Sequence, residues 1–285
     1  MSIYYIVGVT ILIVVILIIL VVMYFVYQYY QYRRETINYC QDVGPYLYRE
    51  QVYLPRFQGI YEKRLAVALL DVSLNVTRSN CTEGELTLPP GFNQSEKFLE
   101  CHIFYNLIER TMLIVFSGTF TVGEWYIDLQ FIQVPCSRLN NYIDGCLCHE
   151  GFYMRYLQMR DFIWGVWNRI SSQIGAVFIT GHSLGGALST LCCFDFTERT
   201  GNARMTHYSF ASPRVGNPTY ADRFNYITGM SSLRVNNTED IIPQLPPASI
   251  EGYTYQHTIQ NVPFTVSLGS LTADHIEAYK CCMPP

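Results

Sequence analysis

From residue 112 onward, two hydrophobic patterns alternate along the chain. Short continuous apolar runs, each bounded by glycine or polar residues, predict buried strands, and Met112–Phe116 is the first of them. Between the runs, apolar residues recur at helical spacing, as they do from Gly151 to Ile174. Strands that alternate with helices indicate an α/β domain with a mostly parallel sheet. Further strands are predicted at Ala176–Thr180, Thr206–Ala211, Leu233–Val235 and Phe264–Leu268, and further helices at Leu184–Arg199 and Pro218–Gly229.

The beginning of the chain follows a different pattern. Met1–Tyr32 carries no charged side chain, and Ile6–Val26 consists almost wholly of Ile, Val and Leu. About 20 such residues span a bilayer core, whereas a secretory signal has an apolar stretch of roughly 7–15. We therefore predict a transmembrane anchor over residues 1–32, with a cleaved signal as the alternative. Residues 33–110 are predicted to form a helical and loop segment that packs on a catalytic core of residues 111–285.

Composition and charge limit the classes of partner. The chain has 285 residues, of which 49% are hydrophobic and 15% charged, as suits one large globular domain with an additional apolar segment. The net charge of −4 is spread without long runs of one sign. Nucleic-acid binding needs a basic patch or stripe, so we expect no nucleic-acid partner.

Two signals disagree about the side of the membrane on which the domain lies. Arg33 and Arg34 follow the predicted anchor and nothing basic precedes it, so the positive-inside rule places the domain in the cytoplasm. N-glycosylation sequons and abundant cysteines favour an exported domain instead. We expect the extracellular or lumenal side, with the cytoplasmic side as the alternative. The sequons lie at Asn75, Asn80, Asn93 and Asn236.

The cysteines also suggest a compartment. The chain has ten of them and no CxxC pair, which favours disulfides over metal ligands. Cys192 and Cys193 fall on a predicted helix, where we expect small buried residues. Disulfides are expected among the other eight, which are Cys40, Cys81, Cys101, Cys136, Cys146, Cys148, Cys281 and Cys282.

A nucleophile motif directly follows the predicted strand Ala176–Thr180. The sequence Gly181-His182-Ser183-Leu184-Gly185-Gly186 contains G-x-S-x-G between a buried strand and a helix. This context suits a nucleophile elbow, in which a strained serine is raised above the sheet. Glycines two residues to either side allow the chain to cross itself closely. The serine also lies at a helix N-terminus, where free N–H groups favour developing negative charge.

A serine nucleophile needs a base and an acid, which follow it in the chain in α/β hydrolases. Asp240 follows the predicted strand Leu233–Val235, and Glu239 is the alternative acid. The histidines after Asp240 are His257 and His275, and chemistry alone favours His275 without excluding His257. We expect His182, inside the elbow, to point elsewhere.

Together these motifs resemble the class 3 lipases, of the fungal triacylglycerol lipase type. The hexapeptide Gly181–Gly186 is identical to the most common form in that family, and the resemblance extends over residues 112–279. It implies an α/β-hydrolase fold, a triad of Ser183, Asp240 and His275, and an oxyanion hole formed by Thr119 and the Leu184 N–H. The other similar blocks are VFSGT from Val115, EWYIDL from Glu124, CHEGF from Cys148, FASPRVGNP from Phe210, DIIPQLPP from Asp240 and DHIEAY from Asp274.

The resemblance also implies an apolar lid, as expected of an element that opens against a lipid surface. Two positions depart from the family pattern. Ser117 replaces the usual arginine before Gly118, and Gln244 stands where the family often has histidine. These changes concern lid geometry and substrate fit more than the chemistry. The implied lid and substrate-binding residues are Phe120, Val122, Trp125, Tyr126 and Ile127.

These observations predict a serine esterase or lipase that hydrolyses carboxylic esters of lipids. An anchor would hold it at a membrane surface, where acylglycerols or phospholipids are the favoured substrates, in the manner of a triacylglycerol lipase or a phospholipase A1. The triad chemistry requires no metal or cofactor. The alternative is a catalytically silent, membrane-anchored interaction protein with the same fold. An intact triad with both elbow glycines argues against it.

Overall fold

The computed structural model describes residues 23, 61–82, 88–118, 130–139, 143–201, 203–258 and 260–284. Apart from Met23, the predicted anchor lies outside these residues. In the part described, no helix is both long and apolar enough to cross a membrane. Several predicted site residues also lie outside it, namely Thr119, Phe120, Val122, Trp125, Tyr126 and Ile127.

The core is a single seven-stranded sheet with the strand order β1-β2-β3-β6-β7-β8-β11. The first three strands pair antiparallel, and from β3 to β11 every neighbouring pair is parallel. The sheet is therefore mostly parallel, as predicted. The strands are β1 Gln94–Phe98, β2 Cys101–Asn106, β3 Thr111–Phe116, β6 Ala176–His182, β7 Met205–Phe210, β8 Ser232–Asn237 and β11 Asn261–Phe264.

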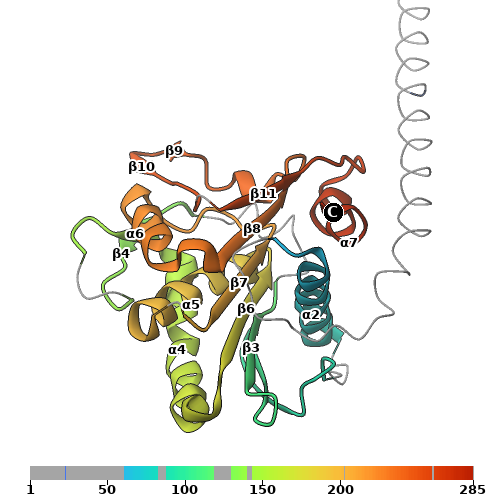
Figure 1. The fold of residues 1–285 in the computed structure, drawn as a ribbon. Coiled ribbons are helices and arrows are strands. Elements are labelled where there is room, and N and C mark those ends of the chain that lie inside the picture. The colour runs from blue at the N-terminus through green and yellow to red at the C-terminus, as the bar shows by residue number, and fades with distance from the viewer. Residues whose placement is uncertain are drawn as a thin grey trace, which may run out of the picture.

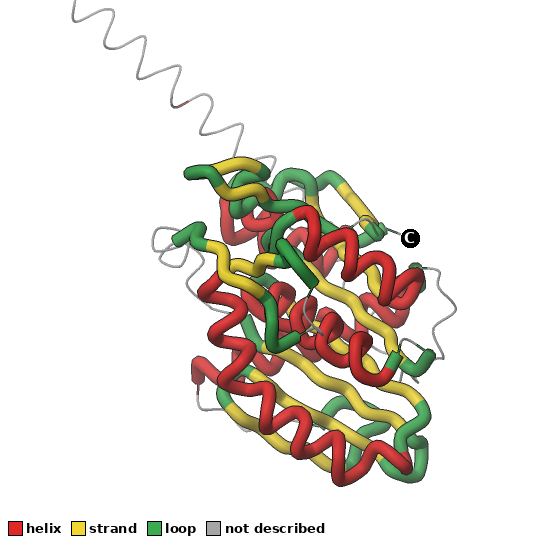
Figure 2. Tube along the Cα trace, turned by 90° about the vertical axis from the view of Figure 1, so that its left-hand side faces the viewer, coloured by secondary structure: helices red, strands yellow, loops and turns green. Residues whose placement is uncertain are grey.

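Helices cover both faces of this sheet. Figure 1 shows α4 (Glu150–Ile170), α5 (Leu184–Thr200) and α6 (Pro218–Thr228) on one face, with α2 (Lys63–Thr82) and α7 (Ala278–Cys282) on the other. Figure 2 shows the helices of the first face in front of the strands that they cover. Side chains of β3 alternate between the faces, since Ile114 packs with the α4–α5 cluster and Val115 with the α2 cluster. A strand that is buried on both faces of a sheet needs apolar side chains at successive positions, which is why its sequence is a continuous apolar run.

Most predicted elements are confirmed to within a few residues. The helical segment predicted within residues 33–110 includes α2, which ends at Thr82. The last strand, β11, ends at Phe264, where it was predicted to begin. The hairpin of β1 and β2 was missed, because β1 is an exposed, mainly polar edge strand. Two small hairpins complete the described strands, β4 (Gln133–Pro135) with β5 (Leu147–His149) and β9 (Ser249–Ile250) with β10 (Tyr253–Thr254).

The cysteines divide into two groups. A disulfide joins Cys136 and Cys146 with an S–S distance of 2.03 Å, which confirms that the fold contains a disulfide. The expectation of disulfides at Cys101 and Cys148 is wrong, because both are free thiols buried in the core. They lie on strands β2 and β5, and burial raises the pKa of both thiols. Buried structural thiols of this kind are inert.

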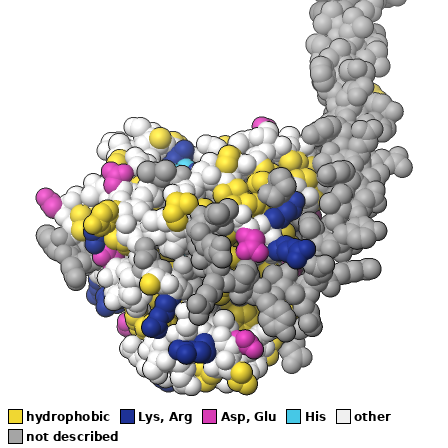
Figure 3. Space-filling model, in the orientation of Figure 1, with side chains coloured by type: hydrophobic (Ala, Val, Ile, Leu, Met, Phe, Trp, Pro, Cys, Tyr) yellow, Lys and Arg dark blue, Asp and Glu magenta, His cyan; other side chains and the backbone are white. Residues whose placement is uncertain are grey.

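The surface carries both signs of charge. Figure 3 shows acidic and basic side chains interspersed over the face that it presents. Several of the charges are paired, as in the ion pair of Arg223 with Glu198 at 2.6 Å.

Candidate active site

The nucleophile motif forms a sharp turn between β6 and α5. Strand β6 ends at His182 and helix α5 begins at Leu184, so Ser183 alone makes the connection. Ser183 has φ 61° and ψ −124°, a conformation that side chains rarely adopt. A Cβ atom at Gly181 would overlap the Gly185 carbonyl, and one at Gly185 would overlap the Phe116 carbonyl. The sequence therefore forms the elbow because only glycine fits at these two crossings.

The elbow leaves the Ser183 hydroxyl free for chemistry. Ser183 is 2% exposed, and its side chain does not cap helix α5. Its backbone is fixed by a hydrogen bond from Ser183 N to Phe210 O at 2.9 Å. The N–H of Leu184, in the first turn of α5, has no acceptor within the helix. This N–H and the helix dipole can stabilise an anion that forms beside the serine.

The structure brings Asp240 and His275 together. Asp240 follows β8, and its Oδ2 accepts a hydrogen bond from His275 Nδ1 at 2.7 Å. Both side chains are buried, with 1% or less exposed. A carboxylate partner fixes the proton on Nδ1, which leaves a lone pair on Nε2. His275 Nε2 is buried and has no hydrogen-bond partner in the described structure. This is the tautomer that a general base requires.

Asp240 has further partners that fix its orientation. Its Oδ1 accepts a hydrogen bond from Ile242 N at 3.0 Å, and its Oδ2 accepts a second from Tyr279 Oη at 3.1 Å. Glu239, the alternative acid, is exposed. The geometry therefore selects Asp240 over Glu239 as the partner of His275. Sequence reasoning placed Tyr279 in a motif but assigned it no role.

Asn237 was missed altogether, and it links three segments of the site. Its backbone N–H donates to Tyr279 Oη at 2.9 Å, and its Nδ2 donates to Val266 O at 2.7 Å and to Asp274 O at 3.1 Å. The residue is 0% exposed. A buried amide at the end of β8 thus ties the strand that carries Asp240 to the segment that carries His275. Its signal in the sequence is an asparagine at the last position of a strand, which is weak.

His182 contacts His275 directly. Its Nε2 donates to the backbone oxygen of His275 at 2.8 Å, and the two rings have centroids 4.6 Å apart. Burial and the nearby His275 lower the pKa of His182 well below its usual value, so His182 stays neutral. The expectation that His182 points away from the site is wrong. The elbow therefore places Ser183 directly after a residue that contacts His275.

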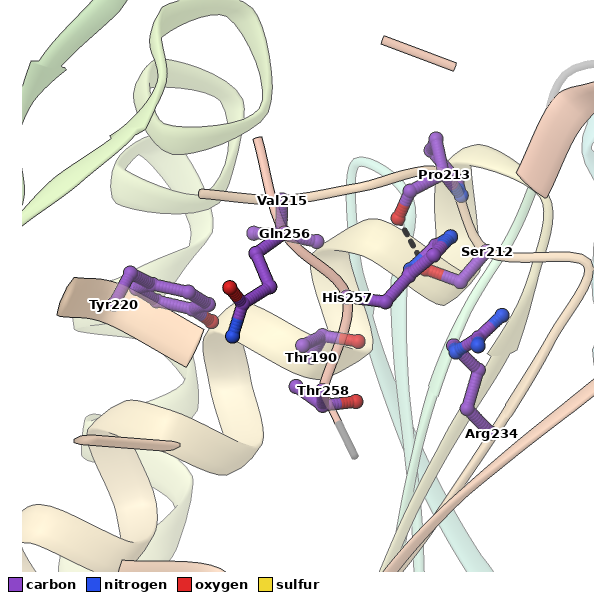
Figure 4. A pocket seen from close by; sticks show the side chains of 9 residues that line it. All are labelled: Thr190, Ser212, Pro213, Val215, Tyr220, Arg234, Gln256, His257 and Thr258. Carbon is purple, nitrogen blue, oxygen red and sulfur yellow. Dashed lines mark hydrogen bonds between the residues drawn. The ribbon is translucent and has the colours of Figure 1, made fainter. Parts of the chain in front are cut away.

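His257, the alternative base, lies elsewhere. Its Nε2 donates to Pro243 O at 2.6 Å, and burial and Arg234 lower its pKa well below the usual value. Figure 4 shows His257 beside a cavity into which Thr190, Ser212 and Arg234 also point. The cavity volume of about 10 Å³ suits one water molecule and no substrate. These contacts therefore favour a structural role for His257 over the role of a base.

Among known proteins, the matching family model is that of lipase (class 3), over residues 113–250. A lipase of Rhizomucor miehei is 34% identical over 148 residues, which cover 50% of this chain and 39% of that protein. Its propeptide complex superposes with a TM-score of 0.59 at 25% identity, over 70% of this chain and 67% of that chain. Secreted mono- and diacylglycerol lipase A of Penicillium cyclopium is 30% identical over 189 residues, 64% of this chain and 59% of that protein. Phospholipase A1-II 6 of rice (Oryza sativa subsp. japonica) is 30% identical over 168 residues, 49% of this chain and 41% of that protein.

The sheet, the elbow on its central strand and the Asp–His pair define an α/β-hydrolase fold. Within that fold, the chain is similar to the class 3 lipases, whose family model matches residues 113–250. The matches span less than two thirds of the length of each of these three relatives.

Proposed function

We propose that this protein is a serine hydrolase of carboxylic esters, with Ser183 as nucleophile, His275 as base and Asp240 as acid. The observation that carries the proposal is the buried 2.7 Å contact of His275 Nδ1 with Asp240, which leaves Nε2 unpaired beside the elbow. His182 contacts His275 directly, and Ser183 is the next residue along the chain. An interaction module would have no need of a strained serine at the elbow together with a buried imidazole whose Nε2 has no partner in the described structure.

The reaction follows from this arrangement. His275 Nε2 takes the hydroxyl proton as Ser183 Oγ attacks the ester carbonyl, and Asp240 stabilises the imidazolium that forms. The oxyanion is held by backbone N–H groups, for which we propose Thr119 and Leu184. The imidazolium then protonates the leaving alcohol, and the C–O ester bond breaks to give an acyl-enzyme. Water, activated by His275, hydrolyses the acyl-enzyme and restores Ser183.

We propose lipid esters as the substrates. The relatives are named for acylglycerols and for phospholipids, and the predicted lid (Phe120, Val122, Trp125, Tyr126 and Ile127) is apolar. A panel of monoacylglycerol, diacylglycerol, triacylglycerol and phospholipid esters, presented in vesicles, separates these classes. Release of fatty acid from one class at a rate at least tenfold above the others would define the headgroup preference.

We further propose that residues 1–32 anchor the protein in a membrane and that the domain lies outside the cell or in a lumen. The disulfide Cys136–Cys146 supports an oxidising compartment, and one relative is a secreted lipase. Asn75 and Asn93 are exposed and open to glycosylation, whereas Asn236 is buried and accepts a hydrogen bond from Arg234. A glycosidase should therefore shift the mobility of the native protein. An unshifted band, with every cysteine alkylated in the absence of reductant, contradicts this placement.

The central experiment compares Ser183→Ala with the parent protein. We expect the variant to fold and to lose both labelling by a fluorophosphonate probe and ester hydrolysis, by about 10⁴-fold or more. His275→Ala should be equally damaging. His257→Ala is the matched control, because it removes a half-buried histidine outside the site, and its loss should be within about tenfold. Substantial hydrolysis by Ser183→Ala, or a greater loss in His257→Ala than in His275→Ala, overturns the assignment.

A further inference from the structure

Helix α2 precedes the region matched by the family model, yet it contacts the catalytic edge of the sheet. Figure 1 shows α2 packed on the face opposite α4 and α5. The helix is held by an apolar face that includes Leu69 and Leu70. It also carries two buried hydroxyls, Ser73 and Thr77, one turn apart. Ser73 Oγ lies 3.4 Å from Thr180 Oγ1 on the nucleophile's strand, β6.

Thr77 contacts the backbone next to the proposed oxyanion residue. Its hydroxyl donates to Ser73 O at 2.9 Å and accepts a hydrogen bond from Gly118 N at 2.8 Å. Thr77 is 8% exposed, so water does not compete freely for this contact. Gly118 follows the end of β3 and immediately precedes Thr119.

Gly118 is confined from the other side as well. A Cβ atom at this position would lie 2.8 Å from His182 O and 3.6 Å from Ser183 Cβ, so the backbone packs against the elbow itself. One residue earlier, Ser117 N donates to Glu100 O at 2.9 Å. The peptide that leads into Thr119 is thus held between α2 and the nucleophile's strand. A fixed peptide here restricts the backbone of Gly118, the last described residue before Thr119.

We propose that Thr77 is a positioning residue for the oxyanion hole. Its hydroxyl holds the Gly118 N–H, and so fixes the Ser117–Gly118 peptide from which the chain enters Thr119, the proposed oxyanion donor. The proposal rests on the proposed function, in particular on Thr119 as an oxyanion donor. It assigns a catalytic contribution to the segment of residues 33–110, which the family match does not cover.

Physical chemistry sets the kind of effect to expect. An oxyanion donor acts mainly in the transition state, so its displacement lowers kcat and leaves KM nearly unchanged. A displacement of about 1 Å costs up to about 100-fold in rate. The triad does not contact Thr77 in the described structure, so the shape of the pH–rate profile should not change.

Thr77 also completes the sequon Asn75-Val76-Thr77, and this determines the controls. Thr77→Val removes the acceptor and the sequon together. Asn75→Gln removes the sequon and leaves Thr77 intact. Thr77→Ser keeps both the hydroxyl and the sequon. Ser73→Ala removes a buried hydroxyl from the same face of α2 but leaves the Thr77–Gly118 contact in place.

The experiment uses the full chain in detergent micelles, with p-nitrophenyl butyrate as substrate and a fluorophosphonate as probe. We expect Thr77→Val to lower kcat and the rate of phosphonylation by about 10- to 100-fold, with KM within about twofold. Thr77→Ser, Asn75→Gln and Ser73→Ala should stay within about threefold of the parent. If Thr77→Val does not fold, Thr77→Ala serves instead, since alanine lacks the acceptor but favours helix.

Two results separate the proposal from its basis. A parent protein that neither hydrolyses the ester nor reacts with the probe overturns the proposed function. An active parent, with kcat of Thr77→Val and Thr77→Ala equal to that of Ser73→Ala, overturns the positioning role alone. A loss in Asn75→Gln equal to that in Thr77→Val also overturns it, because the sequon would then explain the effect.

Discussion

Two buried carboxylates of this protein have opposite surroundings. Asp195 lies on α5, on the side of the sheet away from α2, and is 0% exposed. Asp240 lies beyond the end of β8 and is 1% exposed. Burying a carboxylate is costly unless hydrogen bonds and opposite charge compensate it. The surroundings that offset this cost differ between the two residues, and the difference separates a structural carboxylate from the one that we propose for catalysis.

Asp195 is saturated by donors from α4 and α5. Arg160 Nε lies 2.8 Å from Oδ2, and Arg199 Nε lies 2.9 Å from Oδ1. Tyr156 Oη and Trp164 Nε1 donate to Oδ2 at 2.9 Å and 2.8 Å. Both cations are guanidinium groups, which keep their charge at every physiological pH. The cluster therefore fixes α4 to α5 permanently.

Asp240 has no arginine or lysine among its recorded partners in the described structure. Its donors are an imidazole N–H, a phenol and a backbone N–H. These neutral groups leave the negative charge free to stabilise a cation that appears only during the reaction, the His275 imidazolium. A permanent counter-charge here would weaken that stabilisation. Burial alone thus does not distinguish the two kinds of carboxylate. The distinction is whether the partner carries a permanent positive charge, as at Asp195, or gains one only during the reaction, as proposed at Asp240.

The largest effect should come from Asp240→Asn. The amide can present its NH₂ to His275 Nδ1 and so move the ring proton to Nε2, the wrong tautomer for a base. We expect kcat to fall by about 10⁴-fold, while the melting temperature changes little. Steady-state kinetics and thermal unfolding of the same preparation measure both quantities. A variant that keeps more than about a tenth of the activity would remove Asp240 from the triad.

Asp195→Asn should show the reverse pattern. It leaves the mostly buried Arg160 and the exposed Arg199 without their fully buried carboxylate, and breaking a buried pair costs about 3–5 kcal/mol. We expect the free energy of unfolding to fall by that amount, and kcat to stay near the parent value at temperatures where the variant is folded. Denaturant unfolding followed by circular dichroism provides the measurement. A loss of kcat in fully folded Asp195→Asn would contradict the division between the two carboxylates.

How far the sequence predicts these sites depends on the distance between partners along the chain. The elbow is local, because the strand, both glycines and Ser183 lie within ten residues, so its position could be predicted. Asp240 and His275 are 35 residues apart, and their pairing depended on a resemblance. The choice of His275 over His257 depended on the same resemblance, because chemistry alone left both open.

Other features had no usable signal in the sequence. In the sequence, the spacing of Asp195 and Arg199 indicates an exposed ion pair on one helix. The second partner, Arg160, lies 35 residues earlier, so the buried cluster has no local signal. The contact of Thr77 with Gly118 joins a side chain to a backbone 41 residues away. No propensity or period encodes such contacts. The hairpin of β1 and β2 was missed because its outer strand is exposed on both faces.

Tyr279→Phe should produce an intermediate effect on the catalytic carboxylate. The substitution removes one hydrogen bond to Asp240 and leaves the Asn237 N–H without its acceptor. A hydrogen bond to a charged group is worth about 1.5–3 kcal/mol, so kcat should fall by about tenfold or somewhat more. KM should not change, because neither residue reaches the substrate. An unaltered kcat would show that the imidazole and Ile242 N suffice to orient Asp240.

The smallest effect should come from the exposed member of the Asp195 cluster. The side chain of Arg199 is 48% exposed and that of Arg160 is 15% exposed, although both contact the same carboxylate. Exposed pairs contribute about 0–1 kcal/mol because solvent screens them, whereas a buried pair loses more when one partner is removed. We therefore expect Arg199→Gln to lower the free energy of unfolding by no more than about 1 kcal/mol, and Arg160→Gln to lower it by clearly more.

Both variants should retain the kcat of the parent, and repeating the measurement in high salt should diminish only the Arg199 effect. Equal decreases in the free energy of unfolding for the two arginine variants would contradict this expectation. They would mean that the hydrogen bonds from Tyr156 and Trp164 stabilise Asp195, and that the difference in burial between the two arginines does not matter.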